Sequence, residues 1–437
     1  MAPIPGGALI AIDRLFLHER MGSVALQSLR DAGRTVADPA RVFATMDHIV
    51  DTRPGRTGTL VAGGQAFLAA TRDMTRAAGI RLFDIGDPDQ GIVHVIGPEL
   101  GLALPGSTIA CPDSHTCTQG AMGAFAWGIG SSDAEHALAT GTIRMARPRT
   151  MQITVSGRLM ATAKDLALHI IAVHGSAGGQ GHAVEYGGDT VRAMDIEARL
   201  TLCNMATEFG AVTATIAPDD TVFDWLRGRD HAPAGAMWNR AVTAWRALVT
   251  DDGAVFDREI TVDAASVMPM MSWGTSPAES VAFGAPAGTN AYMNVAGRVA
   301  GLPIDAAFIG SCTNGRLSDL RAAASVLIGR HVAAGVRALV VPGSSAVKRA
   351  AEAEGLDRIF TAAGFEWRES GCAMCFNAGG ETFPLGSRVV SSTNRNFEGR
   401  QGPGVRTHIA SPETVAASAV MGVLTDPRDV LPPSVAA

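Results

Sequence analysis

Three cysteines have a spacing that suits a metal centre. Cys372 and Cys375 form a C-x-x-C pair, and Cys312 lies in a Ser-Cys-Thr-Asn-Gly turn. A C-x-x-C pair taken alone is typical of a zinc half-site or a redox pair. Zinc would need two further Cys or His ligands, and the sequence has no second C-x-x-C and no H-x-x-x-H pair. This weakens the zinc hypothesis without removing it, and Cys312 can join the pair as a third thiolate if the loops meet.

Three thiolates would leave one corner of a four-iron cluster open. Such a cluster normally takes four cysteine ligands, so a three-cysteine site exposes one iron that can bind a hydroxyl and a carboxylate as a Lewis acid. The pattern therefore predicts chemistry at the iron, not electron storage. Cys111, Cys117 and Cys203 are interpreted as small buried hydrophobic residues and are not counted as ligands.

The elements that must position these residues have an α/β pattern. Strand, turn and helix follow one another in several segments, as in parallel α/β layers. One unit runs from a strand ending at Val341 through a turn into a helix expected over 346–360. Another strand begins near Thr150, and Thr162-Ala163-Lys164-Asp165 has the form of a capping box before a helix.

The residues with chemical potential cluster where predicted strands end. Four loops begin near Cys111, Ser311, Cys372 and Asn394, each after an apolar strand. Ligands bind at the carboxyl ends of strands in open α/β sheets, so the four loops are expected to converge on one crevice. Three α/β domains are predicted, over 1–148, 149–270 and 271–437. The Pro/Gly/Ala-rich stretch 275–301 is the best linker candidate.

Composition excludes several classes of protein. A chain of 437 residues with 47% hydrophobic and 18% charged residues fits a soluble globular protein with a large core. Its net charge of -6 argues against a nucleic-acid surface, which needs a basic face. The N-terminus has no basic leader, and no stretch approaches the roughly 20 apolar residues of a membrane span, so the cytoplasm is the expected compartment.

Seven motifs in order resemble the aconitase superfamily, and within it the large subunits of bacterial two-chain isopropylmalate dehydratases. The likeness spans nearly the whole chain. The motifs are Met46-Asp47-His48, GIVHVIGPE around His94, Asp113-Ser114-His115-Thr116, Cys203-Asn204-Met205 with Glu208, the Cys312 turn, Gly371-Cys372-Ala373-Met374-Cys375, and the segment Asn394 to Arg400. The resemblance implies three α/β domains around a cluster-binding cleft and one [4Fe-4S] cluster per subunit, held by Cys312, Cys372 and Cys375.

The implied reaction removes water from a small 2-hydroxy dicarboxylate and adds it back at the neighbouring carbon. The resemblance assigns the catalytic roles to Asp47, His48, His94, Asp113, His115 and Glu208. His48, oriented by Asp47, resembles the acid that protonates the departing hydroxyl. Arg395 and Arg400 resemble carboxylate clamps, a role that suits the planar guanidinium. Ser114, Asn204 and Asn394 resemble polar groups near the substrate and the cluster. Without the cysteines, these Asp–His and Arg motifs would be interpreted as ordinary structural contacts.

Two features of the family are expected to be absent from this chain. The family's fourth, mobile domain carries the proton-abstracting serine, and too few residues follow Arg400 to build it. The resemblance therefore implies an obligate small subunit that supplies this swivel domain and its serine. The opening segment and the region between Trp273 and Asp305 also look shortened.

The substrate is less firmly indicated than the reaction. The family usually has a substrate-binding glutamine near the position of Val24, and an apolar side chain there should change what the site accepts. The leading hypothesis is isomerisation of 2-isopropylmalate in leucine biosynthesis. The alternatives are hydration or isomerisation of citraconate, dimethylmaleate or a bulkier alkylmalate, an iron-responsive RNA-binding protein, and a structural zinc protein.

Overall fold

The computed structural model describes residues 2–284 and 299–430 and divides the chain into two compact units. Unit 1 consists of Met1–His48, Gly63–Ser156 and Gly179–Val262. Unit 2 consists of Ile49–Ala62, Gly157–Gly178 and Asp263–Ala437. The chain therefore passes repeatedly from one unit to the other. Most of the predicted linker, residues 285–298, lies outside the described residues.

The first sheet of unit 1 is parallel, in the order β5-β4-β3-β6-β7. Its strands are β3 (Arg14–His18), β4 (Val42–Thr45), β5 (Arg81–Phe83), β6 (Thr108–Cys111) and β7 (Phe125–Gly128). Every residue of β4 is buried, as expected for a strand that is covered on both faces. Because β3 lies between β4 and β6, the loops after these three strands leave the sheet side by side.

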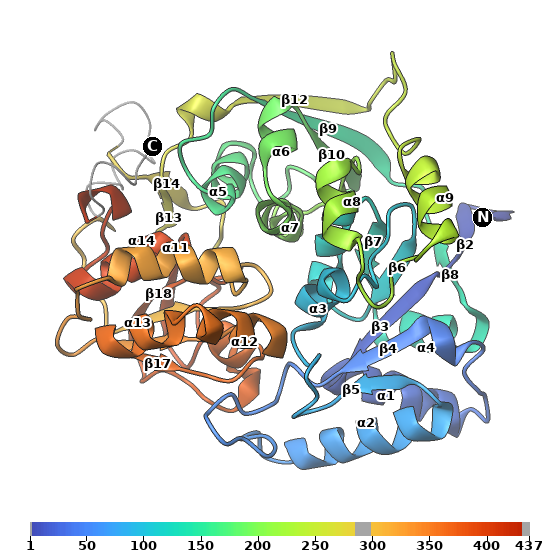
Figure 1. Ribbon diagram of the computed structural model, residues 1–437, viewed down its shortest axis with the longest axis horizontal. Helices are drawn as coiled ribbons and strands as arrows, with labels where there is room; N and C mark the ends of the chain where they lie inside the picture. Colours follow the sequence, from blue (N-terminus) through green and yellow to red (C-terminus); the bar gives the residue numbers. More distant parts are fainter. Residues whose placement is uncertain (1, 285–298, 431–437) are drawn as a thin grey trace. The chain divides into compact units, whose positions relative to one another are not determined.

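Eight helices belong to unit 1 in the described part of the chain. They are α1 (Glu19–Asp31), α2 (Gly64–Ala78), α3 (Val93–Glu99), α4 (Ser131–Thr140), α6 (Asp189–Ala193), α7 (Ile196–Met205), α8 (Asp220–Leu226) and α9 (Ala236–Trp245). Helix α1 packs against both α2 and α4 (Figure 1). It buries Ala25, Leu26 and Leu29 in one apolar cluster with Leu15 and Leu17 of β3. This periodic apolar face anchors α1 on the sheet.

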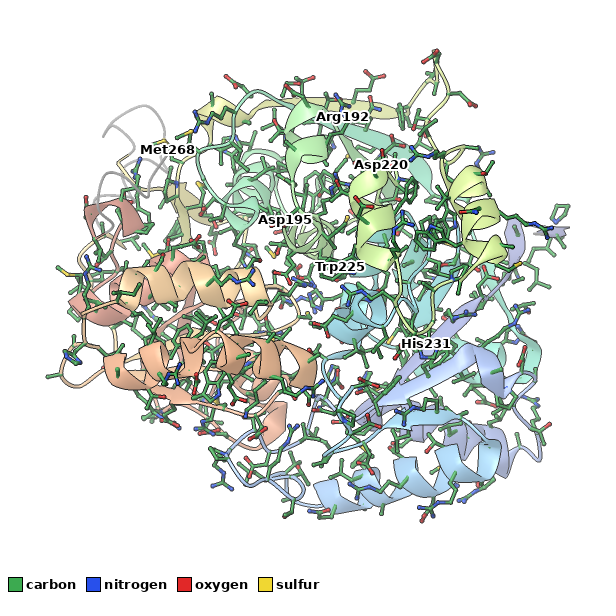
Figure 2. The ribbon with its side chains drawn as sticks, in the orientation of Figure 1. Arg192, Asp195, Asp220, Trp225, His231 and Met268 are labelled. Carbon is green, nitrogen blue, oxygen red and sulfur yellow. The ribbon has the colours of Figure 1, made fainter. Side chains whose placement is uncertain are left out.

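Unit 1 also holds a second sheet, in the order β11-β10-β9-β12. Its strands are β9 (Arg149–Ser156), β10 (His182–Gly187), β11 (Thr213–Ile216) and β12 (Arg258–Asp263). Strand β10 pairs in parallel with β9 and β11. Helix α8 contacts α3 through Trp225, whose indole Nε1 donates to the Pro98 carbonyl at 3.1 Å. The segment after α8 contacts the first sheet through His231, whose ring meets Phe43 of β4 edge-on; Figure 2 labels Trp225 and His231.

Smaller elements complete unit 1. The antiparallel strands β1 (Ala2–Ile4), β2 (Gly7–Ala11) and β8 (Thr142–Met145) form a three-stranded sheet. Two 3-10 segments are η1 (Pro39–Arg41) and η2 (Ser114–Met122). The buried segment η2 contacts β7, β11 and α7, so it lies at the junction of the two larger sheets.

Unit 2 is built on one parallel sheet in the order β17-β16-β15-β18-β19. Its strands are β15 (Ala306–Ile309), β16 (Arg337–Val340), β17 (Phe365–Trp367), β18 (Arg388–Ser391) and β19 (Arg406–Ile409). The antiparallel pair β13 (Met270–Ser272) and β14 (Ser280–Ala282) packs against a helix of the same unit, α5. The 3-10 segments are η3 (Ala264–Ser266), η4 (Ala373–Cys375), η5 (Asn377–Gly379) and η6 (Pro427–Asp429).

The helices of unit 2 are α5 (Ala163–His174), α11 (Leu317–Leu327), α12 (Ser345–Ala353), α13 (Leu356–Ala363) and α14 (Pro412–Met421). Two predictions made from the sequence concern these helices. The capping box at α5 is confirmed, since Thr162 and Asp165 exchange both of its hydrogen bonds. The single helix predicted over 346–360 is wrong. Gly355 adopts a left-handed φ of 76°, which ends α12 and starts α13.

The α/β class with parallel sheets is confirmed. The division into three consecutive domains stays a prediction, although each of its ranges contains one of the three larger sheets. Within the described residues, no helix is both long enough and apolar enough to cross a membrane.

Close packing of η2 on the second sheet generates a testable prediction. A Cβ at Gly120 would overlap the carbonyl oxygen of Ala214 on β11. We expect Gly120→Ala to lower the free energy of unfolding by about 1–3 kcal/mol or more, because backbone must move. Chemical denaturation followed by tryptophan fluorescence measures this. Gly130→Ala is the control, since a Cβ there meets nothing within 4 Å; equal effects of the two changes would contradict the packing argument.

Candidate active site

Unit 1 collects its candidate residues around the carboxyl end of the first sheet. Asp47 and His48 follow β4, and Asp113 follows β6, directly before η2. Helix α3 supplies His94, and η2 supplies His115. The parallel order of β4, β3 and β6 brings these loops to one edge, where ligands bind in open α/β sheets.

The Asp113 carboxylate is the hub of this group. Its Oδ1 accepts from His94 Nε2 at 2.8 Å and from the backbone N–H of His115 at 2.7 Å. Its Oδ2 accepts from His48 Nε2 at 3.1 Å. Burial alone would raise the pKa of Asp113, but the charge of His94 and the hydrogen bonds from His115, His48 and His94 hold it well below its usual range. Asp113 is therefore ionised at neutral pH.

His48 lies between two carboxylates. Its Nδ1 donates to Asp47 Oδ1 at 2.6 Å, while Nε2 donates to Asp113. Asp47 is fully buried, and its other oxygen accepts from Val93 N at 2.9 Å. Burial would lower the pKa of His48, but the charge of Asp47 and the hydrogen bonds to both carboxylates raise it well above 6.5. The ring is thus a protonated imidazolium whose two N–H groups each donate to a carboxylate. It is a proton donor that lies between two anions.

The remaining candidates of unit 1 take different places. His115 Nε2 and Glu208 Oε1 lie 3.1 Å apart, so these two side chains form a second acid–histidine pair next to the hub. Asn204 is buried and donates from Nδ2 to Thr118 Oγ1 at 2.8 Å. Ser114 is exposed at the start of η2, and its carbonyl accepts from Thr207 Oγ1.

Two residues of this edge were missed from the sequence. His18 and Glu19, at the junction of β3 and α1, contact the loops of His48 and Asp113. A signal was available, because RLFLH reads as a buried strand and the residues at its end belong to the same carboxyl edge.

Unit 2 holds the three cysteines, each buried as a free thiol. Cys312 follows β15, and Cys372 and Cys375 follow β17. Both loops contain a non-glycine residue in the left-handed region, Ser311 with φ 86° and Ala373 with φ 44°. Such conformations cost free energy and recur at functional sites, where the surrounding structure enforces them. The backbone is thus held in a shape that local preference alone would not give.

Hydrogen-bond donors point at two of the sulfurs. Asn394 Nδ2 lies 3.5 Å from Cys312 Sγ, and Arg400 Nη2 lies 3.5 Å from Cys375 Sγ. Arg400 Nε also donates to the Cys375 carbonyl at 2.8 Å, and Nη2 reaches Asn394 Oδ1 at 3.3 Å. N–H groups aimed at sulfur stabilise thiolate charge, as an iron–sulfur cluster requires. These contacts give Arg400, predicted as a carboxylate clamp, a second task at the cysteine loop.

The spacing of the cysteines argues against one zinc ion. Among residues 2–284 and 299–430, the single group of three or more possible ligand side chains with ligand atoms within 4.8 Å of one another is His18, Glu19, Asp47 and His48. A tetrahedral zinc ion with Zn–S bonds of about 2.3 Å would bring its sulfurs to roughly 3.8 Å from each other. The sulfurs of Cys312, Cys372 and Cys375 do not all lie within 4.8 Å of one another, so the three are not arranged to bind one zinc ion together.

Two buried cations, also missed from the sequence, hold the Cys312 loop after β15, and one of them also holds the loop after β18. Lys164 Nζ donates to Asn314 Oδ1 at 3.1 Å and to the carbonyls of Ser392 and Thr393 at 2.9 and 2.6 Å. It thereby joins the loop after β15 to the loop after β18. Arg316 donates to the Cys312 carbonyl at 2.6 Å. Arg395 follows Asn394 in the same loop and is partly exposed.

The other three cysteines lie in unit 1 and have a different character. Burial raises the pKa of the Cys111 and Cys203 thiols well above 9.0, and that of Cys117 to about 12. The Cys117 thiol donates to the Cys203 carbonyl at 3.1 Å. These groups are protonated at neutral pH, whereas metal ligands must be thiolates.

Comparison with known proteins decides the family. The model of the aconitase family (aconitate hydratase) matches residues 4–422. The chain belongs to the aconitase family. A curated relative named 3-isopropylmalate dehydratase large subunit 1, from Bradyrhizobium diazoefficiens, is 54% identical over 440 residues, which cover 96% of this chain and 92% of the relative.

A solved structure shares the fold. The crystal structure of aconitase X from Thermococcus kodakaraensis, in its holo-form, aligns with a TM-score of 0.50 and 15% identity. The alignment covers 88% of this chain and 84% of that one. At this identity the likeness concerns the fold alone, and it agrees with the family assignment.

The two carboxylates around His48 generate a prediction on pH. We expect the ring signals of His48, followed by NMR, to titrate above 6.5. Asp113→Asn should lower this pKa, because a neutral amide does not stabilise the imidazolium. A raised pKa in the folded state stabilises the fold below about pH 6.5, and this contribution is lost as the pH rises through the folded value.

Asp219→Asn is the matched control for that titration. It removes a carboxylate of the same unit that pairs with Arg199 at 2.7 Å. The His48 titration should not respond to it. An unshifted His48 in the unaltered protein, or equal responses to the two changes, would show that Asp113 does not hold the proton on His48.

Proposed function

We propose that this chain is the cluster-carrying large subunit of a hydro-lyase that isomerises 2-isopropylmalate to 3-isopropylmalate by dehydration and rehydration. The observation that carries the proposal is the 54% identity, along almost the whole chain, to a protein named as the large subunit of that enzyme. The acid–histidine hub of unit 1 and the cysteine loops of unit 2 supply the groups that such a reaction needs.

Cys312, Cys372 and Cys375 would hold a [4Fe-4S] cluster with one iron free of cysteine. The fit rests on the free, buried thiols, on the N–H groups of Asn394 and Arg400 near two of the sulfurs, and on sulfur positions that do not all fall within 4.8 Å of one another. When bound, a cluster of this kind supplies a Lewis acid that polarises the hydroxyl of a 2-hydroxy acid.

His48 would be the acid of the dehydration step. Hydroxide is a poor leaving group, and a proton delivered to its oxygen lowers the barrier to C–O cleavage. His48 enters the step as an imidazolium, and Asp47 and Asp113 hold its ring in a fixed orientation. The same ring, after giving up its proton, can take one from water in the rehydration step.

The other candidate residues would bind and orient. His94 and His115 fix Asp113, and Glu208 fixes His115, so the hub keeps its geometry while the proton moves. Arg395 and Arg400 are the proposed partners of the substrate carboxylates, because a guanidinium fork matches a carboxylate. Ser114, Asn204 and Asn394 complete the polar surroundings.

A second chain is part of the proposal. The relative is named a large subunit, which implies a small one. We infer that the small subunit supplies the swivel domain and the serine that removes the proton from carbon, as the resemblance of the sequence implies. The net charge of -6 and the 54% identity to a dehydratase large subunit argue against the RNA-binding alternative.

Serine substitutions of the cysteines test the cluster. In anaerobically prepared protein, we expect Cys312→Ser, Cys372→Ser and Cys375→Ser each to reduce bound iron and sulfide and the visible absorbance of the cluster, because each removes a thiolate ligand. Cys117→Ser, at a thiol in unit 1, should retain iron. Exposure to air should release iron, and ferrous iron with reductant should restore activity. Full iron content in all three variants would refute the ligand assignment.

A substrate panel with the reconstituted pair tests the reaction. The chain, its small subunit and reloaded iron and sulfide should interconvert 2- and 3-isopropylmalate, with no turnover by either chain alone. Citraconate, dimethylmaleate and bulkier alkylmalates form the comparison set, since Val24 is exposed on α1 where a polar residue was expected. Turnover of one of these without turnover of 2-isopropylmalate would reject the proposed substrate and retain the hydro-lyase.

A further inference from the structure

The dipeptide His18–Glu19 occupies a special place in unit 1. It lies where β3, the middle strand of the first sheet, gives way to α1, and both side chains are almost fully buried. The strands on either side are β4, which leads to Asp47 and His48, and β6, which leads to Asp113. One dipeptide therefore faces both loops of the hub.

Glu19 holds the backbone of the first loop. Its Oε2 accepts from Asp47 N at 3.0 Å, and its Oε1 accepts from His48 N at 2.7 Å. A carboxylate that accepts two successive N–H groups fixes the orientation of the peptide plane between them. Because Asp47 and His48 project their side chains from this peptide, the direction of the acid pair is set by Glu19.

His18 holds the second loop and supports the His48 ring. Its Nε2 lies 3.1 Å from the Pro112 carbonyl, one residue before Asp113, so Nε2 carries the proton. Its ring stacks on that of His48 with centroids 3.9 Å apart and planes 17° from parallel. Burial and the charge of His48 lower the pKa of His18 to about 4, which keeps it neutral against the imidazolium.

A metal ion is the competing explanation, because the ligand atoms of His18, Glu19, Asp47 and His48 lie within 4.8 Å of one another. Hydrogen bonds engage most of these groups, and among the described residues the exception is His18 Nδ1, a buried nitrogen with no hydrogen-bond partner. Both oxygens of Glu19 and of Asp47 accept N–H groups, and both ring nitrogens of His48 are engaged. Two stacked imidazoles also cannot both direct a lone pair at one ion between them. The geometry is that of a hydrogen-bonded brace.

We propose that His18 and Glu19 are positioning residues. They hold the Asp47–His48 loop and the Asp113 loop in the relative position that places His48 between the two carboxylates. The consequence for turnover rests on the proposed function. The consequence for the loops does not, so the two parts can be tested separately.

Hydrogen exchange tests the brace without any assay of activity. Glu19→Gln keeps the shape of the side chain but presents an NH2 group to one of the two backbone N–H donors. In the complete chain, mass spectrometry should show the peptide that contains Asp47 and His48 exchanging roughly tenfold faster or more, since a hydrogen bond to a charged group is lost. Glu135→Gln removes a carboxylate of the same unit that pairs with Arg34, and should leave this peptide unchanged.

Kinetics of the reconstituted pair test the consequence. Glu19→Gln should lower kcat by roughly 100-fold with little change in KM, because a misplaced acid harms the chemical step more than binding. His18→Phe keeps a stacked ring but loses the hydrogen bond to Pro112. It should show the same kinetic pattern and faster exchange around Asp113, and it decides the matter if Glu19→Gln does not fold.

Unchanged exchange in the folded variants overturns the brace. Faster exchange with an unchanged kcat overturns its catalytic role. If the unaltered pair turns over no alkylmalate, the proposed function fails, and the exchange experiment still decides whether the brace exists.

Discussion

The central constraint in unit 1 is the burial of charge. Asp47, Asp113 and the protonated His48 are withdrawn from water, and a buried charge is tolerated only if it is paired and hydrogen-bonded. Each carboxylate is therefore supplied with N–H groups from more than one segment, among them the loop after β4, helix α3 and η2. This requirement explains why so many short segments end at one edge of the sheet. Asp47 and Asp113, which hold the His48 ring in position, also raise its pKa and so keep it protonated.

In unit 2 the constraint is an unfavourable backbone conformation, and hydrogen bonds from buried groups again help to maintain it. Its cysteine loops include left-handed residues at Ser311 and Ala373, which local preference opposes. The buried cations Lys164 and Arg316 donate to side-chain and backbone oxygens of the Ser311 loop, and Lys164 also donates to carbonyls of the loop after β18. Three of the loops leave neighbouring parts of one parallel sheet, after β15, β17 and β18. The sheet of unit 2 fixes where these loops start, and Lys164 and Arg316 fix the course of the loops after β15 and β18.

Part of this arrangement could be predicted from the sequence. Apolar strands followed by polar loops indicated the parallel α/β class, and the rule that ligands bind at carboxyl ends singled out the loop of Asp113. Asp47 and His48 were indicated by the family resemblance alone. The expected convergence of four loops remains a prediction, since the Cys111 loop follows a strand of unit 1 and the other three follow strands of unit 2. His18 and Glu19 escaped notice because their roles depend on strand order, which brings together residues far apart in the chain. The break at Gly355 was not predicted, because the residues on both sides of it have the periodicity of a single helix.

The interleaving of the two units has a consequence for biosynthesis. The first passage of the chain between units falls directly after His48, and unit 1 is not complete until its third segment, which ends at Val262, has been made. A nascent chain on the ribosome therefore holds the acid pair long before β9 to β12 exist to complete the unit. Neither unit can be released as a contiguous fragment by a single cut in the gene. Unit 1 cannot complete its folding until all three of its segments have been synthesised. Segments made early therefore expose apolar surface for longer, and such surface is what chaperones bind.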